Sequence, residues 1–120
     1  MQNNDVVVIR FSTEFEEELH RLSKRFRNIK SDIQSVITRL QEGEILGDRI
    51  ARICEEWVIY KVRVRNSNIQ KGKSAGYRII YQAVSLKSIV LLTIYSKSDR
   101  EDIGINEIRE LLSEFYPDEG

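Results

Sequence analysis

The side chains best suited to chemistry in this 120-residue chain are lysines, arginines and tyrosines concentrated between residues 57 and 100. This segment holds nine Lys and Arg residues against the single acid Asp99, a net charge of +8, although the whole chain is neutral. Cations bind phosphate oxygens and aromatic rings stack on unpaired bases, so such a surface suits single-stranded RNA. The residues in question include Lys61, Arg63, Arg65, Lys71, Lys73, Arg78, Tyr95 and Lys97.

A cluster of this kind permits RNA cleavage without a metal ion. RNA carries its own nucleophile, the 2′-OH, so a protein need only remove its proton, stabilise the phosphorane charge and protonate the 5′-oxygen. The planar arginine side chain suits the charge stabilisation, because it grips phosphate oxygens and stays protonated. A lysine crowded by other cations has a lowered pKa and can act as the base. A purely structural cationic face, which guards the sheet against edge pairing, would use the same residues.

Other chemistries lack the residues they need. Gly72-Lys73-Ser74 resembles the end of a P-loop, but Ser67 stands where that motif requires glycine. His20 is the single histidine, and the carboxylates are expected in the helices and the tail and not beside the basic sheet, so neither a catalytic triad nor a two-metal site is expected. Cys54 is the single cysteine and is interpreted as a small buried hydrophobe. The sequence therefore predicts no metal and no cofactor.

The length predicts one domain over residues 1–116, with a frayed tail at 117–120. No apolar run approaches the 18 residues that a membrane span requires. The first residues lack the basic start and the apolar run of a signal peptide. We therefore expect a cytoplasmic protein that does not enter a membrane.

Hydrophobic periodicity predicts the elements that position these side chains. Capping boxes at Thr13/Glu16 and Ser31/Gln34 predict the starts of two helices, the second ending at Gly43. A buried strand is predicted at 6–11, further strands at 57–65, 76–84 and 89–97, and a closing helix at 105–115. Gly47-Asp48 predicts a turn, and Arg49 to Cys54 form either an irregular extended stretch or a short strand. The order β-α-α-β-β-β-α predicts an α+β domain with a mainly antiparallel sheet and helices packed on one face.

A period of two in the strands separates core from cations. Lys61, Arg63 and Arg65 alternate with apolar residues, so they project from the face opposite the core. In the last strand, Leu91, Thr93, Tyr95 and Lys97 are predicted to share one face. If the strands pair in register, the cations and Tyr95 converge on one surface. The predicted core comprises Leu19, Ile37, Val62, Val64, Ile79, Tyr81, Leu92 and Ile94.

Three segments, in this order and spacing, resemble the RelE/ParE toxin superfamily, and above all its mRNA-cleaving RelE-like and HigB-like branch. They are residues 60–65 (YKVRVR), 76–82 (GYRIIYQ) and 91–99 (LLTIYSKSD), and the loop 71–78 (KGKSAGYR) resembles a HigB-type segment. The similarity covers about residues 43–112. It implies a RelE-like domain that acts as the toxin of a type II toxin–antitoxin module. Such toxins are metal-independent endoribonucleases that cleave mRNA, usually in the ribosomal A site, and leave a 2′,3′-cyclic phosphate.

The resemblance also implies roles for individual residues. Lys61 and Arg63 match strand residues that serve as base and charge stabiliser, and Arg78 matches the arginine on the scissile phosphate. Lys97 falls on the basic end of the last strand. A functional tyrosine of the family aligns near Gly104, so Tyr95 is the candidate for that role. The residues assigned to substrate binding are Arg65, Lys71, Lys73 and Arg100, the last in place of a family arginine that is Ser98 here.

The implied partners are mRNA, the ribosome and a cognate antitoxin that carries a DNA-binding domain. Two other functions remain open. A ParE-like toxin would inhibit gyrase by protein contact and would cleave no RNA. A catalytically inactive module would bind RNA through the same cations, with a steep salt dependence.

Overall fold

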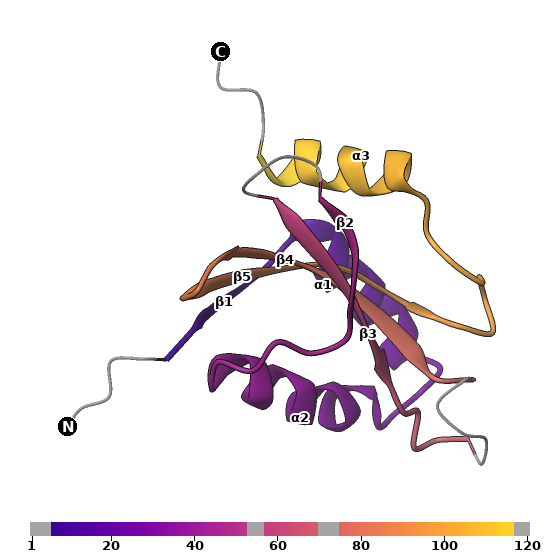
Figure 1. Cartoon of the computed structure of the whole chain (residues 1–120). Helices are drawn as coiled ribbons and strands as arrows, with labels where there is room; N and C mark the ends of the chain where they lie inside the picture. Colours follow the sequence, from indigo (N-terminus) through magenta and orange to yellow (C-terminus); the bar gives the residue numbers. More distant parts are fainter. Residues whose placement is uncertain (1–5, 53–56, 70–74, 117–120) are drawn as a thin grey trace.

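The computed structural model describes residues 6–52, 57–69 and 75–116, and over these ranges it is an open five-stranded sheet flanked by three helices (Figure 1). The elements are β1 (Val8–Phe11), α1 (Thr13–Ser23), α2 (Ile29–Gln41), β2 (Asp48–Arg52), β3 (Val58–Val64), β4 (Tyr77–Ser85), β5 (Ser88–Ser96) and α3 (Ile105–Phe115). The strand order is β1-β5-β4-β3-β2, and only the β1–β5 pair among these is parallel. The α+β class with a mainly antiparallel sheet is therefore confirmed. Within the described ranges, no helix has the length and apolar character needed to span a bilayer.

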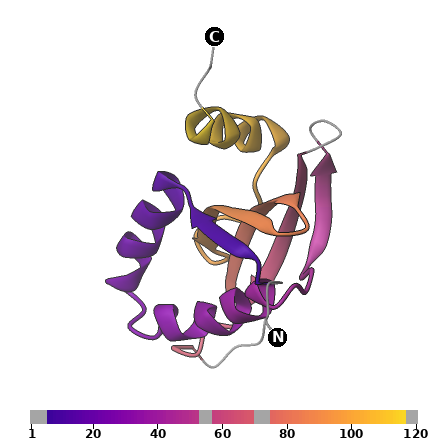
Figure 2. The same ribbon diagram turned by 90° about the vertical axis from the view of Figure 1, so that its left-hand side faces the viewer.

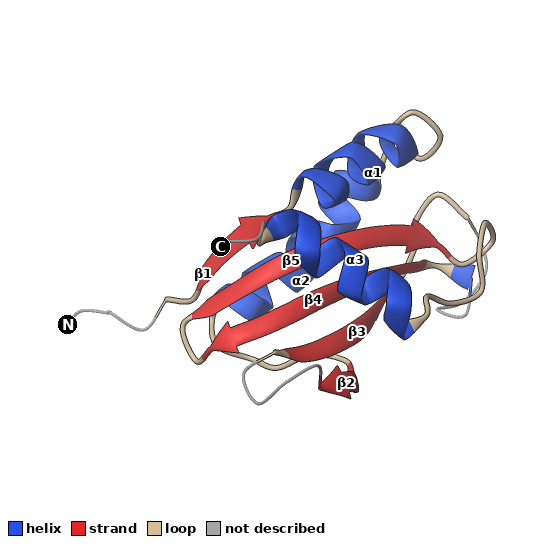
Figure 3. Cartoon of the chain, turned by 90° about the horizontal axis from the view of Figure 1, so that it is seen from above, coloured by secondary structure: helices blue, strands red, loops and turns tan. Residues whose placement is uncertain are grey.

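Helix α3 lies on the opposite face of the sheet from α1 and α2 (Figures 1 and 3). Ile79 of β4 belongs to the apolar cluster that includes Ile37 of α2. Its neighbour Ile80 belongs to a second cluster, together with Ile108 of α3. The prediction that the helices pack on one face is therefore wrong. Successive strand residues point to opposite faces, so adjacent buried isoleucines require an apolar cover on both.

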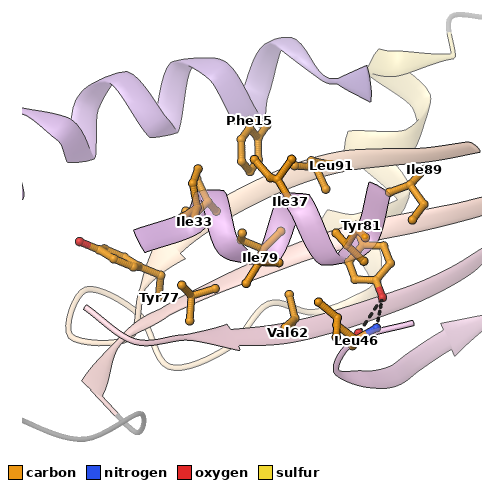
Figure 4. Packing of buried hydrophobic residues seen from close by; sticks show 14 of the residues in the cluster. Phe15, Ile33, Ile37, Leu46, Val62, Tyr77, Ile79, Tyr81, Ile89 and Leu91 are labelled. Carbon is orange, nitrogen blue, oxygen red and sulfur yellow. Dashed lines mark hydrogen bonds between the residues drawn. The ribbon is translucent and has the colours of Figure 1, made fainter. Parts of the chain in front are cut away.

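The predicted core is confirmed at every position except Leu19, which is half-buried at its edge. Most of these residues lie between the sheet and the pair α1 and α2, as Figure 4 shows for Ile37, Val62, Ile79 and Tyr81. Leu92 belongs instead to the cluster under α3. Figure 2 shows α1 and α2 spreading apart from their connecting turn, so each covers a different part of the sheet.

The segment before β3 forms an additional strand. Residues 48–52 form β2, antiparallel to β3, so the order is β-α-α-β-β-β-β-α; Cys54 lies outside the described residues. The chain turns into β2 at Gly47, with φ of +84°. The hydroxyl of Tyr81 fixes this turn, since it accepts a hydrogen bond from the Leu46 amide at 3.0 Å and donates one to the Leu46 carbonyl at 2.6 Å (Figure 4).

The helices begin close to the predicted places but with different caps. Ser12 caps α1, because its Oγ accepts from the Phe15 amide at 3.0 Å; Thr13 is already the first helical residue. Helix α2 starts at Ile29, two residues before the predicted Ser31 cap, and its N-cap Asn28 makes no side-chain capping bond. The Ser12 hydroxyl also donates to the Leu92 carbonyl at 2.8 Å, and this tertiary bond explains the choice of cap.

Strand β1 lies at the edge of the sheet rather than inside it. Its side chains remain accessible, with Val8 57% and Phe11 41% exposed. The prediction of a buried strand is wrong here, because β1 is an edge strand that pairs, within the described residues, with β5 alone.

Candidate nucleic-acid interface

The centre of the candidate site is a row of three residues that cross-strand pairing places side by side. Arg63 of β3 is in register with Arg78 of β4, and Arg78 is in register with Tyr95 of β5. Residues paired directly across antiparallel strands have their Cβ atoms about 4.5–5.5 Å apart on the same face. The predicted convergence of these strands is therefore confirmed for these three residues. We call Arg63, Arg78 and Tyr95 the central row.

A bulge at Leu92 brings Tyr95 into this row. Ile80 pairs with Thr93 whereas Tyr81 pairs with Leu91, so Leu92 is an extra residue on β5. An extra residue reverses the alternation of side chains on either side of it. Leu91 therefore packs in the α1–α2 cluster while Tyr95 packs in the α3 cluster. The prediction that Leu91 shares a face with Tyr95 is wrong.

The members of the central row differ greatly in exposure. Arg63 is exposed, whereas Arg78 is 4% exposed and donates to the Tyr77 carbonyl at 3.2 Å. Burial and the neighbouring charge of Arg63 lower the pKa of Arg78. Tyr95 is 6% exposed, and its hydroxyl has no hydrogen-bond partner of normal geometry. Burial and the negative charge of Asp102 raise the pKa of Tyr95. Arg63 is therefore the member that a ligand reaches first.

Lys61 lies two residues before Arg63, and its partner is an acid that the sequence reasoning missed. The Lys61 Nζ atom is 3.1 Å from Oδ1 of Asp102, which also accepts from the Ile103 amide at 2.8 Å. These two bonds, helped by the charge of Lys97, lower the pKa of Asp102. The expectation that no carboxylate lies beside the basic strands is therefore wrong. The chain from β5 to α3 returns over the sheet and carries Asp102 with it.

The charge distribution along the sequence contained a signal for this acid. Residues 101–120 carry a net charge of −6 and directly follow the basic segment, whose net charge is +8. Opposite charges in adjoining segments favour folding of one onto the other. Two acids from the region after residue 100, Asp102 and Glu107, do pair with cations of the basic segment.

Arg100 covers the Tyr95 ring. Its guanidinium carbon lies 5.3 Å from the ring centroid, a cation–π contact. Its two terminal nitrogens donate to the two carboxylate oxygens of Glu107 at 3.0 and 2.6 Å. This bidentate pair raises the pKa of Arg100 and lowers that of Glu107. The tyrosine ring is therefore not an open stacking platform for a base, contrary to the sequence interpretation, because Arg100 lies on it.

The remaining predicted residues are less closely grouped. Lys97 directly follows β5 and is half-buried, with its amide bonded to the Gly76 carbonyl at 2.9 Å. Arg65 directly follows β3, is exposed and lines a groove with Arg63 and with Asp32 and Arg39 of α2. It therefore extends the basic surface around the β3 edge, away from Tyr95. Lys71 and Lys73 lie outside the described residues.

The composition of the site limits its chemistry. In residues 6–52, 57–69 and 75–116, His, Cys, Asp and Glu side chains do not gather in any group of three that could hold a metal ion. The groups of the cluster that can exchange a proton are Lys61, Lys97, Tyr95 and Asp102. Arg63 and Arg78 can only stabilise negative charge, because arginine stays protonated. The arrangement therefore suits an anionic ligand and proton transfer by side chains.

Comparison of the chain with models of protein families, with curated proteins and with solved structures found no match.

Proposed function

We propose that this protein is the toxin of a type II toxin–antitoxin module and cleaves mRNA without a metal ion. The observation that carries the proposal is the central row, in which Arg63, Arg78 and Tyr95 stand side by side on three neighbouring strands. Lys61 and Lys97 flank this row, at the positions that resemble basic residues of the RelE-like branch. A surface of two arginines, two lysines and a tyrosine matches the needs of a phosphodiester whose nucleophile is the adjacent ribose hydroxyl.

In this mechanism the exposed Arg63 binds the scissile phosphate from the solvent side. The buried Arg78 beside it stabilises the negative charge of the same phosphate. The 2′-oxygen forms a bond to phosphorus as its proton passes to a base, and the bond from phosphorus to the 5′-oxygen breaks as that oxygen takes a proton from an acid. The products are a 2′,3′-cyclic phosphate and a 5′-hydroxyl end. Lys61, Lys97 and Tyr95 are the groups proposed to exchange these protons. Two fixed cations stabilise the extra charge of the phosphorane.

The resemblance on which this proposal partly rests implies two further partners. The toxin would act on mRNA in the ribosome, and a cognate antitoxin with a DNA-binding domain would hold it inactive. The lysines and arginines of β3 and of the segments beside it supply the electrostatic attraction that a ribosomal site demands.

The test is induced expression of the wild type, Arg63→Ala and Lys87→Ala, with growth curves and mapping of new 5′ ends in a reporter mRNA. Arg63 is exposed, so its loss removes a phosphate contact without opening the core. Lys87 lies in the turn at the opposite end of β4 and serves as the matched loss of one positive charge. We expect arrest and new 5′ ends with the wild type and Lys87→Ala, and neither with Arg63→Ala.

Two results would overturn the proposal. Arrest without new mRNA ends would point to a protein target, such as gyrase in the ParE-like alternative. Unchanged cleavage by a variant with alanine at Lys61, Arg63 and Lys97 would show that the site lies elsewhere.

Cleavage should not depend on a metal ion bound to the protein, since no metal takes part in the proposed chemistry. Purified wild-type protein that has been treated with EDTA and then freed of the chelator should cleave an mRNA on ribosomes as well as untreated protein does.

A further inference from the structure

A carboxylate lies inside the cationic cluster, on the connection between β5 and α3. Asp102 lies 3.1 Å from Lys61 and is close enough to Arg78, Tyr95 and Lys97 to act on them electrostatically. A phosphodiester needs the same surroundings, namely several cations and a hydroxyl around one negative charge. We propose that Asp102 occupies the place of a substrate phosphate and that RNA binds by displacing it from Lys61. This inference rests on the proposed function and concerns the regulation of the same site.

The structure gives Asp102 the freedom that such a displacement requires. Its side chain is 65% exposed, and it lies in the connection between β5 and α3, outside both elements. The connection is fixed on either side, since Arg100 is paired with Glu107 and Ile103 is buried under α3. The carboxylate can therefore turn out to solvent while the backbone, the sheet and α3 stay in place.

The energetics also favour exchange. The Asp102 carboxylate is exposed although Lys61 is half-buried, so water and salt reach the ion pair from the side of the acid and weaken it. A nucleic-acid strand brings several phosphates, so Arg63 and Lys97 can engage its backbone at the same time. In the described part of the chain neither of these cations forms an ion pair with an acid. Asp102 thus competes weakly for Lys61. A polyanion that also contacts neighbouring cations displaces Asp102 from Lys61, whereas an isolated anion does not.

The test compares RNA binding by the wild type, Asp102→Asn and Glu101→Gln. Asparagine keeps an oxygen that can accept from the Ile103 amide, so the connection to α3 retains its bond. Glu101 is the adjacent acid, is exposed and forms no ion pair within the described ranges, which makes its variant a matched change of charge. The probe is a single-stranded RNA with 2′-O-methyl riboses throughout, which cannot be cleaved. Thermal melts verify that all three proteins are folded.

We expect Asp102→Asn to bind this RNA about three- to tenfold more tightly than the wild type, and Glu101→Gln to bind it like the wild type. The slope of log K against log salt should be the same for all three proteins, because RNA displaces Asp102 from Lys61 in the wild type and the bound states make the same phosphate contacts. Equal affinities for all three proteins would overturn the role of Asp102 and leave the proposed function standing.

Inorganic phosphate, titrated calorimetrically into the same proteins, separates the two ideas. If none of the proteins binds RNA but Asp102→Asn binds phosphate more tightly than both others, the RNA function is wrong and the anion site is supported. If neither RNA nor phosphate distinguishes Asp102→Asn from Glu101→Gln, the inference is wrong. A weaker affinity of Asp102→Asn for RNA would also overturn it, because Asp102 would then support binding.

Discussion

The hydroxyl of Tyr81 bonds both backbone groups of Leu46, a residue 35 positions earlier in the chain. Through these two bonds, β4 in the middle of the sheet fixes the turn that leads into the edge strand β2. The hydroxyl is buried, and its burial raises the pKa of Tyr81 to about 12, so it stays protonated and can donate at any physiological pH.

Tyr81→Phe should lower the free energy of unfolding by about 1–3 kcal/mol, because it leaves a buried amide and carbonyl without partners. The measurement is urea denaturation followed by circular dichroism. Tyr95→Phe is the matched control, since the Tyr95 hydroxyl is buried but makes no hydrogen bond of normal geometry. Its stability should be unchanged or slightly higher. Equal losses in the two variants would show that the bonds to Leu46 are not what stabilises this turn.

Gly47→Ala should destabilise the protein by at least about 2 kcal/mol. Its φ is +84°, and an added Cβ would lie 2.2 Å from the Lys61 carbonyl oxygen and 2.8 Å from the Val62 Cα. Both atoms belong to the backbone of β3, so they cannot move aside without distorting the sheet. Gly43→Ala isolates the backbone term, because Gly43 has φ of +98° but no atom within 4 Å of an added Cβ. A comparable melting temperature for the two variants would contradict the contribution of the close approach.

Glu14→Gln should make the protein more stable than Glu16→Gln at pH 7. Burial and the nearby Glu18 raise the pKa of Glu14, so its charged form is disfavoured in the folded state. A carboxyl with a raised folded pKa contributes stability at low pH that is lost as pH rises through that pKa. Removing the charge therefore helps above the folded pKa, and the advantage should vanish below the ordinary value of 4.5.

Glu16 is the control because it is exposed and lies in the same first turn of α1, where both acids interact with the helix dipole. The measurement is chemical denaturation of both variants and the wild type at pH 7 and pH 4. Lower stability of Glu14→Gln than of Glu16→Gln at pH 7 would mean that burial does not penalise the Glu14 charge.

The sequence was sufficient to predict the strands of the central row, because period-two patterns separate Lys61 and Arg63 from their apolar neighbours. The position of α3 was not predicted, although the run Ile89–Ile94, apolar except for Thr93, indicates a strand that is buried on both faces. The bulge at Leu92 could not be read from β5 alone, since it exists only in the register with β4. Asp102 was missed because its place depends on which face of the sheet α3 covers, and the position of α3 was not predicted.

The parallel pairing of β1 with β5 determines when the protein can be completed. The Ser12 hydroxyl bonds the carbonyl of Leu92, which is synthesised 80 residues later. Strand β1 therefore lacks its β5 partner until β5 has left the ribosome, and contacts of such long range slow folding. A prematurely terminated product that lacks β5 has neither the neighbour of β1 nor the tyrosine of the central row. The ribosome must therefore have translated β5 before this chain can present the surface proposed to act on translation itself.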